Sequence, residues 1–272
     1  MSIKSRIKNS PLLYPIVFFV KYKIYLPLKR GHVSYYIKYS LFEKRKEIEN
    51  LIKHGFESIE PMAPCSWRIG KEKDKAFRRY YTAVLNGKKC FIKVGVKDST
   101  VKNEAEVYNA IKDADIDFIA KPLVIDLCFA EDTVMVSNEF IDGLKSLKSI
   151  SDYEQFKELC SQFQSVLSRL KALQIVHADI HKANMMLTAQ GKLILLDFGI
   201  SIVGNKQKQV NYRARRGTFF RESPDGTTRV YDDAYSFVKM FETLDLDPSW
   251  KDAEEFCAIE KLQDDYSVTV IL

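Results

Sequence analysis

The sequence predicts an α+β fold in which a strand-rich N-terminal half precedes a largely helical half. Two strand-like segments flank Asn86-Gly87, a dipeptide that favours a tight hairpin turn. Apolar residues recur at three- and four-residue steps through 153–173, which is typical of an amphipathic helix. A second, shorter hairpin is expected within 185–196, where two apolar runs enclose a glycine turn.

The composition is that of a globular protein. Of the 272 residues, 46% are hydrophobic and 29% are charged, which is enough apolar material for one large domain or two lobes. The five cysteines are scattered and include no Cys-x-x-Cys pair. This pattern favours a reducing compartment over a disulfide framework, so we expect a cytoplasmic protein.

Positive charge is concentrated near the N-terminus. Residues 1–40 contain eight Lys or Arg and no acidic residue, whereas the remainder has 34 basic and 36 acidic residues. The apolar run at 11–20 is too short to cross a bilayer, and no small-residue cleavage site follows it. Basic residues interleaved with tyrosines fit a segment on the anionic inner membrane face, and packing of 16–20 against the body is an equal alternative. The body has no comparable basic patch, so no nucleic-acid partner is expected.

In the N-terminal half, strands are expected at 66–70, 76–85 and 89–94, followed by a helix at 100–112. Lys93 lies in the third of these strands, among mostly apolar residues. A charge that is buried in such a strand needs a partner, so a carboxylate from the next helix or an anionic ligand is expected beside it. The alternative is a lysine on the exposed face of the strand.

Oxygen-bearing side chains gather around the short hairpin. Asp179 and Asn184 precede its first strand and Asp197 follows its second, so their oxygens would face a common space. Carboxylate and amide oxygens suit Mg²⁺, which completes its coordination with water and phosphate. His177 and His181 are four residues apart, as zinc ligands on a helix are, but no third ligand follows at a suitable spacing. The sequence therefore favours magnesium over zinc.

These motifs together resemble the catalytic and metal-binding loops of protein-kinase-like phosphotransferases. The matching residues are His-Ala-Asp-Ile-His-Lys-Ala-Asn from position 177 and Asp-Phe-Gly from position 197. The resemblance implies that Asp179 is the catalytic base, that Asn184 and Asp197 bind Mg²⁺, and that His177 is structural. It also implies a two-lobed fold, with a small β-rich N-lobe that carries one main helix.

In the N-lobe, the same resemblance assigns Lys93 to the α- and β-phosphates of ATP. It assigns Glu104 to the ion pair with this lysine, with Glu106 as the second choice. The segment around Glu139 to Ile141 resembles the hinge between the lobes, so its backbone groups would bond the adenine ring.

The C-terminal half is expected to contain a helix at 153–173, opened by a capping box of Ser151 and Glu154, and another helix at 230–241. By the resemblance, Asp233 in the latter helix supports the backbone of the catalytic loop.

The sequence departs from the family pattern in three places. The loop Gly-x-Gly-x-x-Gly is absent, and Gly70 alone remains to bring the backbone close to phosphates. His181 replaces the lysine that is usual in Ser/Thr kinases. About thirty residues follow the helix expected at 230–241, which predicts a truncated C-lobe. In these three features the sequence resembles bacterial sugar, lipopolysaccharide-core and small-molecule kinases.

We therefore expect a basic, aromatic N-terminal extension at 1–55, an N-lobe at 56–142 and a C-lobe at 143–272. The expected activity is ATP- and Mg²⁺-dependent transfer of the γ-phosphate to a hydroxyl. The acceptor would be a sugar, glycan or lipid-linked glycan, as for lipopolysaccharide-core kinases. An atypical Ser/Thr protein kinase is the first alternative, and a nucleotide-binding pseudokinase scaffold is the second.

Overall fold

The computed structural model describes residues 44–62, 68–69, 77–204 and 219–271. The chain divides into two compact units, residues 1–57 and 58–272. In the first unit the described residues form helix α5 (Lys44–Lys53). Most of the predicted N-terminal extension, and also Gly70, lie outside the described residues. Within the described ranges, no helix combines the length and apolar character needed to cross a bilayer.

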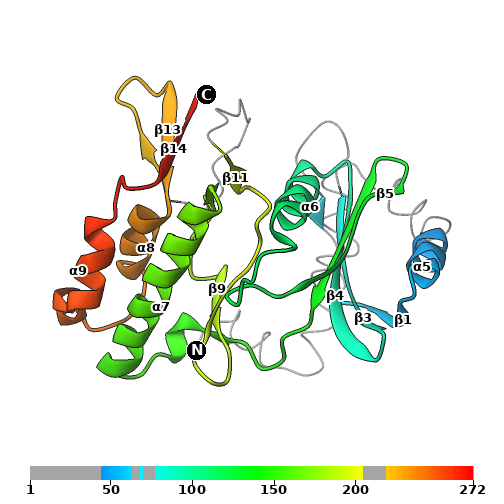
Figure 1. The fold of residues 1–272 in the computed structure, drawn as a ribbon, viewed down its shortest axis with the longest axis horizontal. Helices are drawn as coiled ribbons and strands as arrows, with labels where there is room; N and C mark the ends of the chain where they lie inside the picture. Colours follow the sequence, from blue (N-terminus) through cyan, green and yellow to red (C-terminus); the bar gives the residue numbers. More distant parts are fainter. Residues whose placement is uncertain (1–43, 63–67, 70–76, 205–218, 272) are drawn as a thin grey trace, which may run out of the picture. The chain divides into compact units, whose positions relative to one another are not determined.

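The second unit contains a six-stranded sheet (Figure 1). Its centre is the predicted hairpin, in which Asn86 and Gly87 have φ values of 50° and 74°, as a type I′ turn requires. The strands run in the order β1-β3-β4-β6-β5, with β2 also paired to β3. They span Glu57–Pro61 (β1), Arg68–Ile69 (β2), Phe77–Leu85 (β3), Lys88–Val96 (β4), Pro122–Ala130 (β5) and Thr133–Glu139 (β6).

Helix α6 (Ser99–Ile111) lies beside this sheet (Figure 1). Asp98 caps its N-terminus by accepting hydrogen bonds from the backbone N–H groups of the first turn. The helix approaches β4 closely because Gly95 has no side chain. A Cβ added there would lie 2.6 Å from the Cβ of Val101. The close packing fixes the position of α6 relative to β4.

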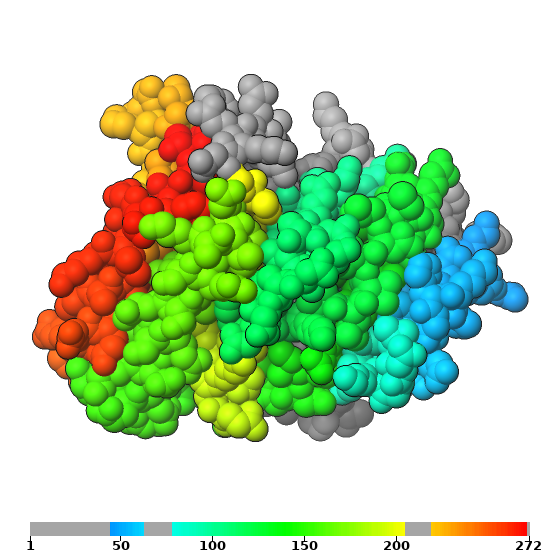
Figure 2. Space-filling view, in the orientation of Figure 1, coloured from blue at the N-terminus to red at the C-terminus, as the bar shows by residue number. Residues whose placement is uncertain are grey.

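Three helices, α7 (Tyr153–Ala172), α8 (Asp233–Phe241) and α9 (Glu254–Lys261), pack together, and α7 and α9 adjoin on one face (Figure 2). Their shared core is aromatic, and the rings of Phe163 and Phe237 stack with centroids 4.2 Å apart. Two 3₁₀ helices, η3 (Leu147–Ser149) and η4 (Pro248–Asp252), accompany them.

Short β-ladders frame the segment that carries the motifs. The predicted short hairpin is present as the antiparallel pair β9 and β10. The three small sheets have the orders β10-β9-β7, β11-β8 and β12-β13-β14. Their strands are Lys145–Ser146 (β7), Ile175–Val176 (β8), Met185–Leu187 (β9), Leu193–Leu195 (β10), Ile202–Val203 (β11), Arg221–Glu222 (β12), Thr228–Asp232 (β13) and Ser267–Ile271 (β14).

Helix α7 begins at Tyr153 as predicted, but its N-cap differs from the prediction by one residue. Asp152, and not Ser151, is the N-cap, and its side chain accepts from Gln155 N at 2.9 Å. Gln155 Oε1 in turn accepts from Ser151 N at 3.2 Å. The N-cap bond is therefore present one position later than the Ser151–Glu154 pattern indicated, because Asp152 is an equally good cap, and Gln155 bonds the N–H of the residue before the cap and not that of the cap itself.

The helix predicted at 230–241 begins only at Asp233. The preceding residues belong to β13, which is antiparallel to β14 at the C-terminal end of the described chain. The helical period of the apolar residues extended across this boundary, but pairing with a strand some forty residues later determines the local structure.

Candidate active site

Lys93 and Glu104 form a buried ion pair between the sheet and α6. The Nζ of Lys93 donates to Oε2 of Glu104 and lies 3.4 Å from Oδ1 of Asp197. The two residues of the pair are only 6% and 2% exposed. Burial by itself lowers the pKa of Lys93, but the carboxylates of Asp197 and Glu104 raise it by more, so the pKa lies above its ordinary value. The lysine therefore stays charged at neutral pH.

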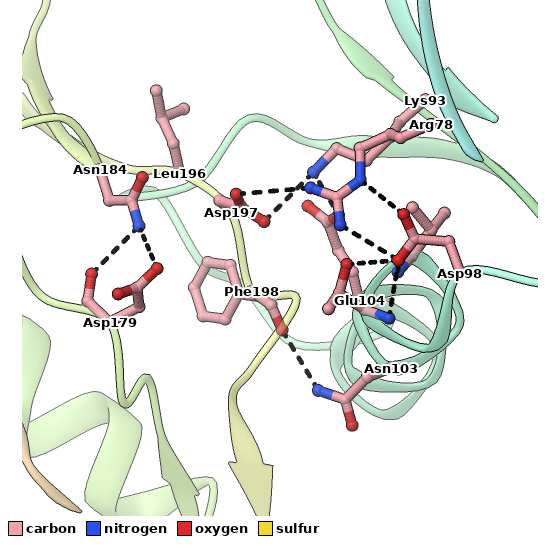
Figure 3. Close-up of polar contacts among 12 residues, drawn as sticks. Arg78, Lys93, Asp98, Asn103, Glu104, Asp179, Asn184, Leu196, Asp197 and Phe198 are labelled. Atoms are coloured by element: carbon pink, nitrogen blue, oxygen red, sulfur yellow. Dashed lines mark hydrogen bonds and ion pairs between the residues drawn. The ribbon is translucent and has the colours of Figure 1, made fainter. Parts of the chain in front are cut away.

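Asp179 and Asn184 form a second polar group. The Nδ2 of Asn184 donates to the backbone oxygen of Asp179 at 3.1 Å and to its Oδ2 at 3.0 Å. The Nε2 of His181 lies 3.6 Å from the same Oδ2. Because the Asn184 amide nitrogen is used in this way, its Oδ1 lies on the opposite side of the amide (Figure 3), and its role as a metal ligand stays a prediction.

Asp233 holds the backbone just before Asp179. Its Oδ2 accepts from His177 N at 2.7 Å and its Oδ1 accepts from Ala178 N at 3.0 Å. Ala178 has a φ of 63°, a conformation that costs a non-glycine residue about 1–3 kcal/mol and persists only where the surroundings enforce it. Burial raises the pKa of Asp233 to about 7, against the opposing effect of the two backbone donors. The carboxylate of Asp233 thus enforces the strained turn that presents Asp179.

The ring of His177 joins the two motif loops. Its Nδ1 accepts from Asp179 N at 3.3 Å, which leaves Nε2 as the donor to the backbone oxygen of Leu196 at 3.1 Å. The ring also packs on Phe198, with centroids 4.6 Å apart. Burial lowers the pKa of His177, so the ring is neutral at pH 7. This geometry agrees with the structural role that the sequence predicted for His177.

Asp197 lies between the two polar groups (Figure 3). The preceding residue, Leu196, donates its N–H to the backbone oxygen of Asn184 at 2.9 Å, which places Asp197 beside Asn184. Asp197 has a φ of 63°, and one of its oxygens faces Lys93. A carboxylate and an amide oxygen on adjacent segments fit Mg²⁺ in their donor chemistry.

Helix α6 is fastened to the Asp-Phe-Gly segment. The Nδ2 of Asn103 donates to the backbone oxygen of Ser201 at 2.8 Å and to that of Phe198 at 3.4 Å. Tyr108, five residues further along the helix, packs its ring on Phe198 with centroids 5.7 Å apart. These contacts hold α6, and with it Glu104, against the loop that carries Asp197.

Comparison with known proteins agrees with this geometry. The model of the ABC1 atypical kinase-like domain matches residues 101–221. Serine/threonine-protein kinase 10 of Danio rerio is 27% identical over 153 residues, which is 52% of this chain and 15% of that protein. Serine/threonine-protein kinase 10-A of Xenopus laevis is 29% identical over 198 residues, or 65% of this chain and 19% of that protein. This chain therefore spans less than a fifth of the length of these relatives.

These matches support a protein-kinase-like superfamily for this chain. The resemblance inferred from the two motifs is thus confirmed at the level of the superfamily, as is the α+β fold. The further resemblance to sugar and lipopolysaccharide-core kinases finds no support among these relatives.

The segment that the sequence predicted to be the hinge, Glu139 to Ile141, begins at the last residue of β6. The N–H of Glu139 donates to the backbone oxygen of Lys121 at 2.8 Å, and the N–H of Phe140 donates to that of Lys89 at 3.1 Å. Among the described residues, the N–H of Ile141 has no backbone partner. Ile141 N–H and Glu139 C=O therefore remain the candidates for bonding adenine, and their role stays a prediction. Gly70, the other predicted nucleotide contact, lies outside the described residues.

Sequence reasoning missed two charged residues of the kinase-like site, Arg78 and Asp98. Arg78 lies on β3 with its side chain 3% exposed, and its Nε donates to Asp98 Oδ2 at 3.0 Å. Its Nη1 is 4.0 Å from Asp197 Oδ2. Strand alternation could have revealed Arg78. In the β3–β4 hairpin Tyr80 is opposite Lys93, and Arg78, two residues before Tyr80, lies on the same face of the sheet.

Proposed function

We propose that this chain is an ATP- and Mg²⁺-dependent phosphotransferase that moves the γ-phosphate of ATP to a hydroxyl group. The observation that carries the proposal is the position of Asp197. It lies 3.4 Å from a lysine that is itself paired with a helix glutamate, and it adjoins Asn184 through the Leu196 hydrogen bond. A phosphate-binding cation and two metal-binding oxygens therefore meet at one place.

Each residue has a distinct task in this proposal. Lys93, held in place by Glu104, binds the α- and β-phosphates. Asp197 and Oδ1 of Asn184 would hold Mg²⁺, which would supply positive charge to offset the charge of the transferring phosphoryl group. The backbone of Glu139 and Ile141 binds adenine. These groups orient ATP before any bond is broken, and orientation and electrostatics account for most of the catalysis in reactions of this kind.

Asp179 acts on the acceptor. Its side chain is 4% exposed and is oriented by Asn184, so its carboxylate has little freedom to move. In the proposed mechanism one oxygen accepts the hydroxyl proton of the acceptor as the acceptor oxygen bonds to the γ-phosphorus and the bond to ADP breaks. His177 stays neutral and takes no part in the proton transfer, because both of its ring nitrogens are engaged with the backbone.

A protein hydroxyl is the acceptor that the comparisons favour. The relatives that match this chain carry the names of serine/threonine-protein kinases, and the matching family model is that of an atypical kinase-like domain. This reverses the order of acceptors inferred from the sequence, in which a glycan came first. We therefore propose an atypical Ser/Thr protein kinase, with a glycan hydroxyl as the competing substrate.

The test compares Asp179→Asn and Asp197→Asn with the wild-type chain, using labelled ATP, Mg²⁺ and a panel of protein and glycan acceptors. Either substitution should lower turnover by about two to four orders of magnitude, as expected when a general base or a charge-stabilising group is lost. Asp245→Asn, which removes an exposed carboxylate away from the site, is the control and should leave turnover unchanged.

Three outcomes separate the alternatives. Labelled protein with unlabelled glycan supports a protein kinase, and the converse supports a glycan kinase. Binding of ATP without transfer to any acceptor supports a pseudokinase scaffold. Wild-type turnover in the Asp179→Asn variant contradicts the assignment of the base.

A further inference from the structure

Arg78 has a buried guanidinium nitrogen that is not hydrogen-bonded within the part of the chain that the structure describes. One edge of its guanidinium is used, because Nε and Nη2 donate to the two carboxylate oxygens of Asp98 at 3.0 and 3.2 Å. The remaining nitrogen, Nη1, is buried and makes no hydrogen bond within the described residues. It forms an ion pair with Oδ2 of Asp197 at 4.0 Å, a separation beyond hydrogen-bonding distance. A buried donor of this kind costs free energy unless a ligand satisfies it.

The free edge of Arg78 faces the residues that would surround the phosphates. Figure 3 shows its guanidinium beside the ammonium of Lys93, with both groups directed toward Asp197. In the β3–β4 register Arg78 is opposite Gly95, and the next residue on the same face of β3, Tyr80, is opposite Lys93. The two cations therefore lie on one face of the sheet, next to the predicted metal ligand.

Charge balance at this cluster calls for an anion once a metal ion is bound. The cations Lys93 and Arg78 face the carboxylates of Glu104, Asp98 and Asp197, which leaves one net negative charge. A divalent cation on Asp197 changes this to one net positive charge. An anionic ligand with several oxygens, such as a polyphosphate, would neutralise that charge and accept from the free Nη1.

The sequence around Arg78 explains why such a residue would be needed. Gly70 is the only glycine between residues 63 and 76, where kinases have a glycine-rich loop whose backbone holds the phosphates. Arg78 follows this segment directly, at the second position of β3. An arginine fork suits phosphate because it offers parallel donors of fixed geometry and a charge that is always present.

We propose that Arg78 is a phosphate-binding residue that contacts the β- or γ-phosphate of ATP and takes over part of the role of the missing glycines. Asp98 orients it by holding the Nε/Nη2 edge, so that the other edge points into the nucleotide site. This inference rests on the proposed function, since it requires that the site bind a nucleoside triphosphate.

The competing explanation is that Arg78 only anchors the N-terminus of α6 through Asp98. The two explanations differ in which ligands respond to a mutation. A phosphate contact affects ATP and ADP but not adenosine, whereas an anchor affects every ligand of the site together.

The experiment is calorimetric titration of the full chain with Mg²⁺-ATP, Mg²⁺-ADP and adenosine. In the Arg78→Gln variant the affinity for ATP should fall by about ten- to a hundredfold, the usual effect of losing a charge-assisted phosphate contact, and adenosine affinity should stay within about twofold. Arg78→Lys, which keeps the charge but loses the fork, should show an intermediate loss for ATP.

A second variant keeps the inference testable if Arg78→Gln does not fold. Arg78→Gln/Asp98→Asn removes both charges of the buried pair and keeps a good N-cap, so it should fold where the single variant does not, and it should show the same selective loss for ATP. Equal losses for ATP and adenosine, or full ATP affinity without Arg78, would overturn the inference while leaving the proposed function intact. If the wild-type chain binds adenosine and ATP equally weakly, both the proposed function and the inference fail.

Discussion

Replacing Asp233 with asparagine tests how the catalytic loop is held in place. The carboxylate accepts from His177 N and Ala178 N at 2.7 and 3.0 Å. Asparagine keeps one acceptor oxygen, but its amide group would face the other backbone N–H, so one charge-assisted bond is lost and one buried donor is left unsatisfied. We expect the free energy of unfolding at neutral pH to fall by about 2–3 kcal/mol. We expect kcat to fall as well, because the turn before Asp179 loses the contact that enforces its strained φ.

The pH dependence makes this prediction sharper. Burial raises the pKa of Asp233 from 3.8 to about 7, so on raising the pH the carboxyl ionises first in the unfolded chain. Its proton therefore stabilises the folded chain at acidic pH, and this contribution is lost between pH 4 and 7. From pH 5 to pH 8 the loss amounts to about 2–3 kcal/mol. Asparagine does not titrate, so the stability difference between wild type and variant should shrink by that amount over the same interval.

Urea denaturation of wild type and Asp233→Asn at pH 5, 6, 7 and 8 measures this difference directly. Asp245→Asn serves as the control, since Asp245 is exposed and its replacement should leave the pH profile parallel to that of the wild type. A stability difference between wild type and Asp233→Asn that is constant from pH 5 to pH 8 would refute the proposed ionisation behaviour of Asp233.

Three further predictions concern the remaining contacts of the site. Lys93→Met should lower the free energy of unfolding, measured in urea titrations, by about 3–5 kcal/mol. Burial already raises the pKa of Glu104, and the variant leaves this carboxyl without its cation. Adding Glu104→Gln to Lys93→Met should restore part of the lost stability. Asn103→Ala should accelerate amide hydrogen exchange in residues 198–204 and cost about 1–3 kcal/mol, since the buried oxygen of Ser201 loses its donor. Chelation of divalent cations should abolish phosphoryl transfer, and added Mg²⁺ should restore it; transfer that persists in excess chelator would exclude the proposed role of Asn184.

Local patterns in the sequence predicted those parts of the fold that depend on local interactions. The hairpin at Asn86-Gly87 follows from the positive φ that both residues adopt readily, and α7 follows from its apolar period. Strands β13 and β14 were not predicted, because each is short and they are stabilised by pairing across about forty residues. The start of α8 was misplaced for the same reason.

The same distinction between local and long-range interactions applies to the site. The roles of Asp179, Asn184 and Asp197 could be proposed from motifs because their spacing along the chain is characteristic. Arg78 was missed because no motif surrounds it. Its position depends on the register of β3 against β4, which places it near Lys93 although the two are fifteen residues apart in sequence.

The geometry of the site depends on buried polar side chains outside the reacting groups. Asp233 fixes the turn before Asp179, and His177 ties that turn to the backbone of Leu196. Asn103 fastens α6 to the segment after Phe198. Each of these residues joins two segments that are distant in sequence and satisfies backbone groups that would otherwise be buried without a partner. Because a partly satisfied buried network costs more than it contributes, the segments that carry Glu104, Asp179 and Asp197 are expected to keep their relative positions together or to lose them together. In this protein the Lys93–Glu104 pair and the fixed Asp-Phe-Gly segment are thus parts of one cooperative structure.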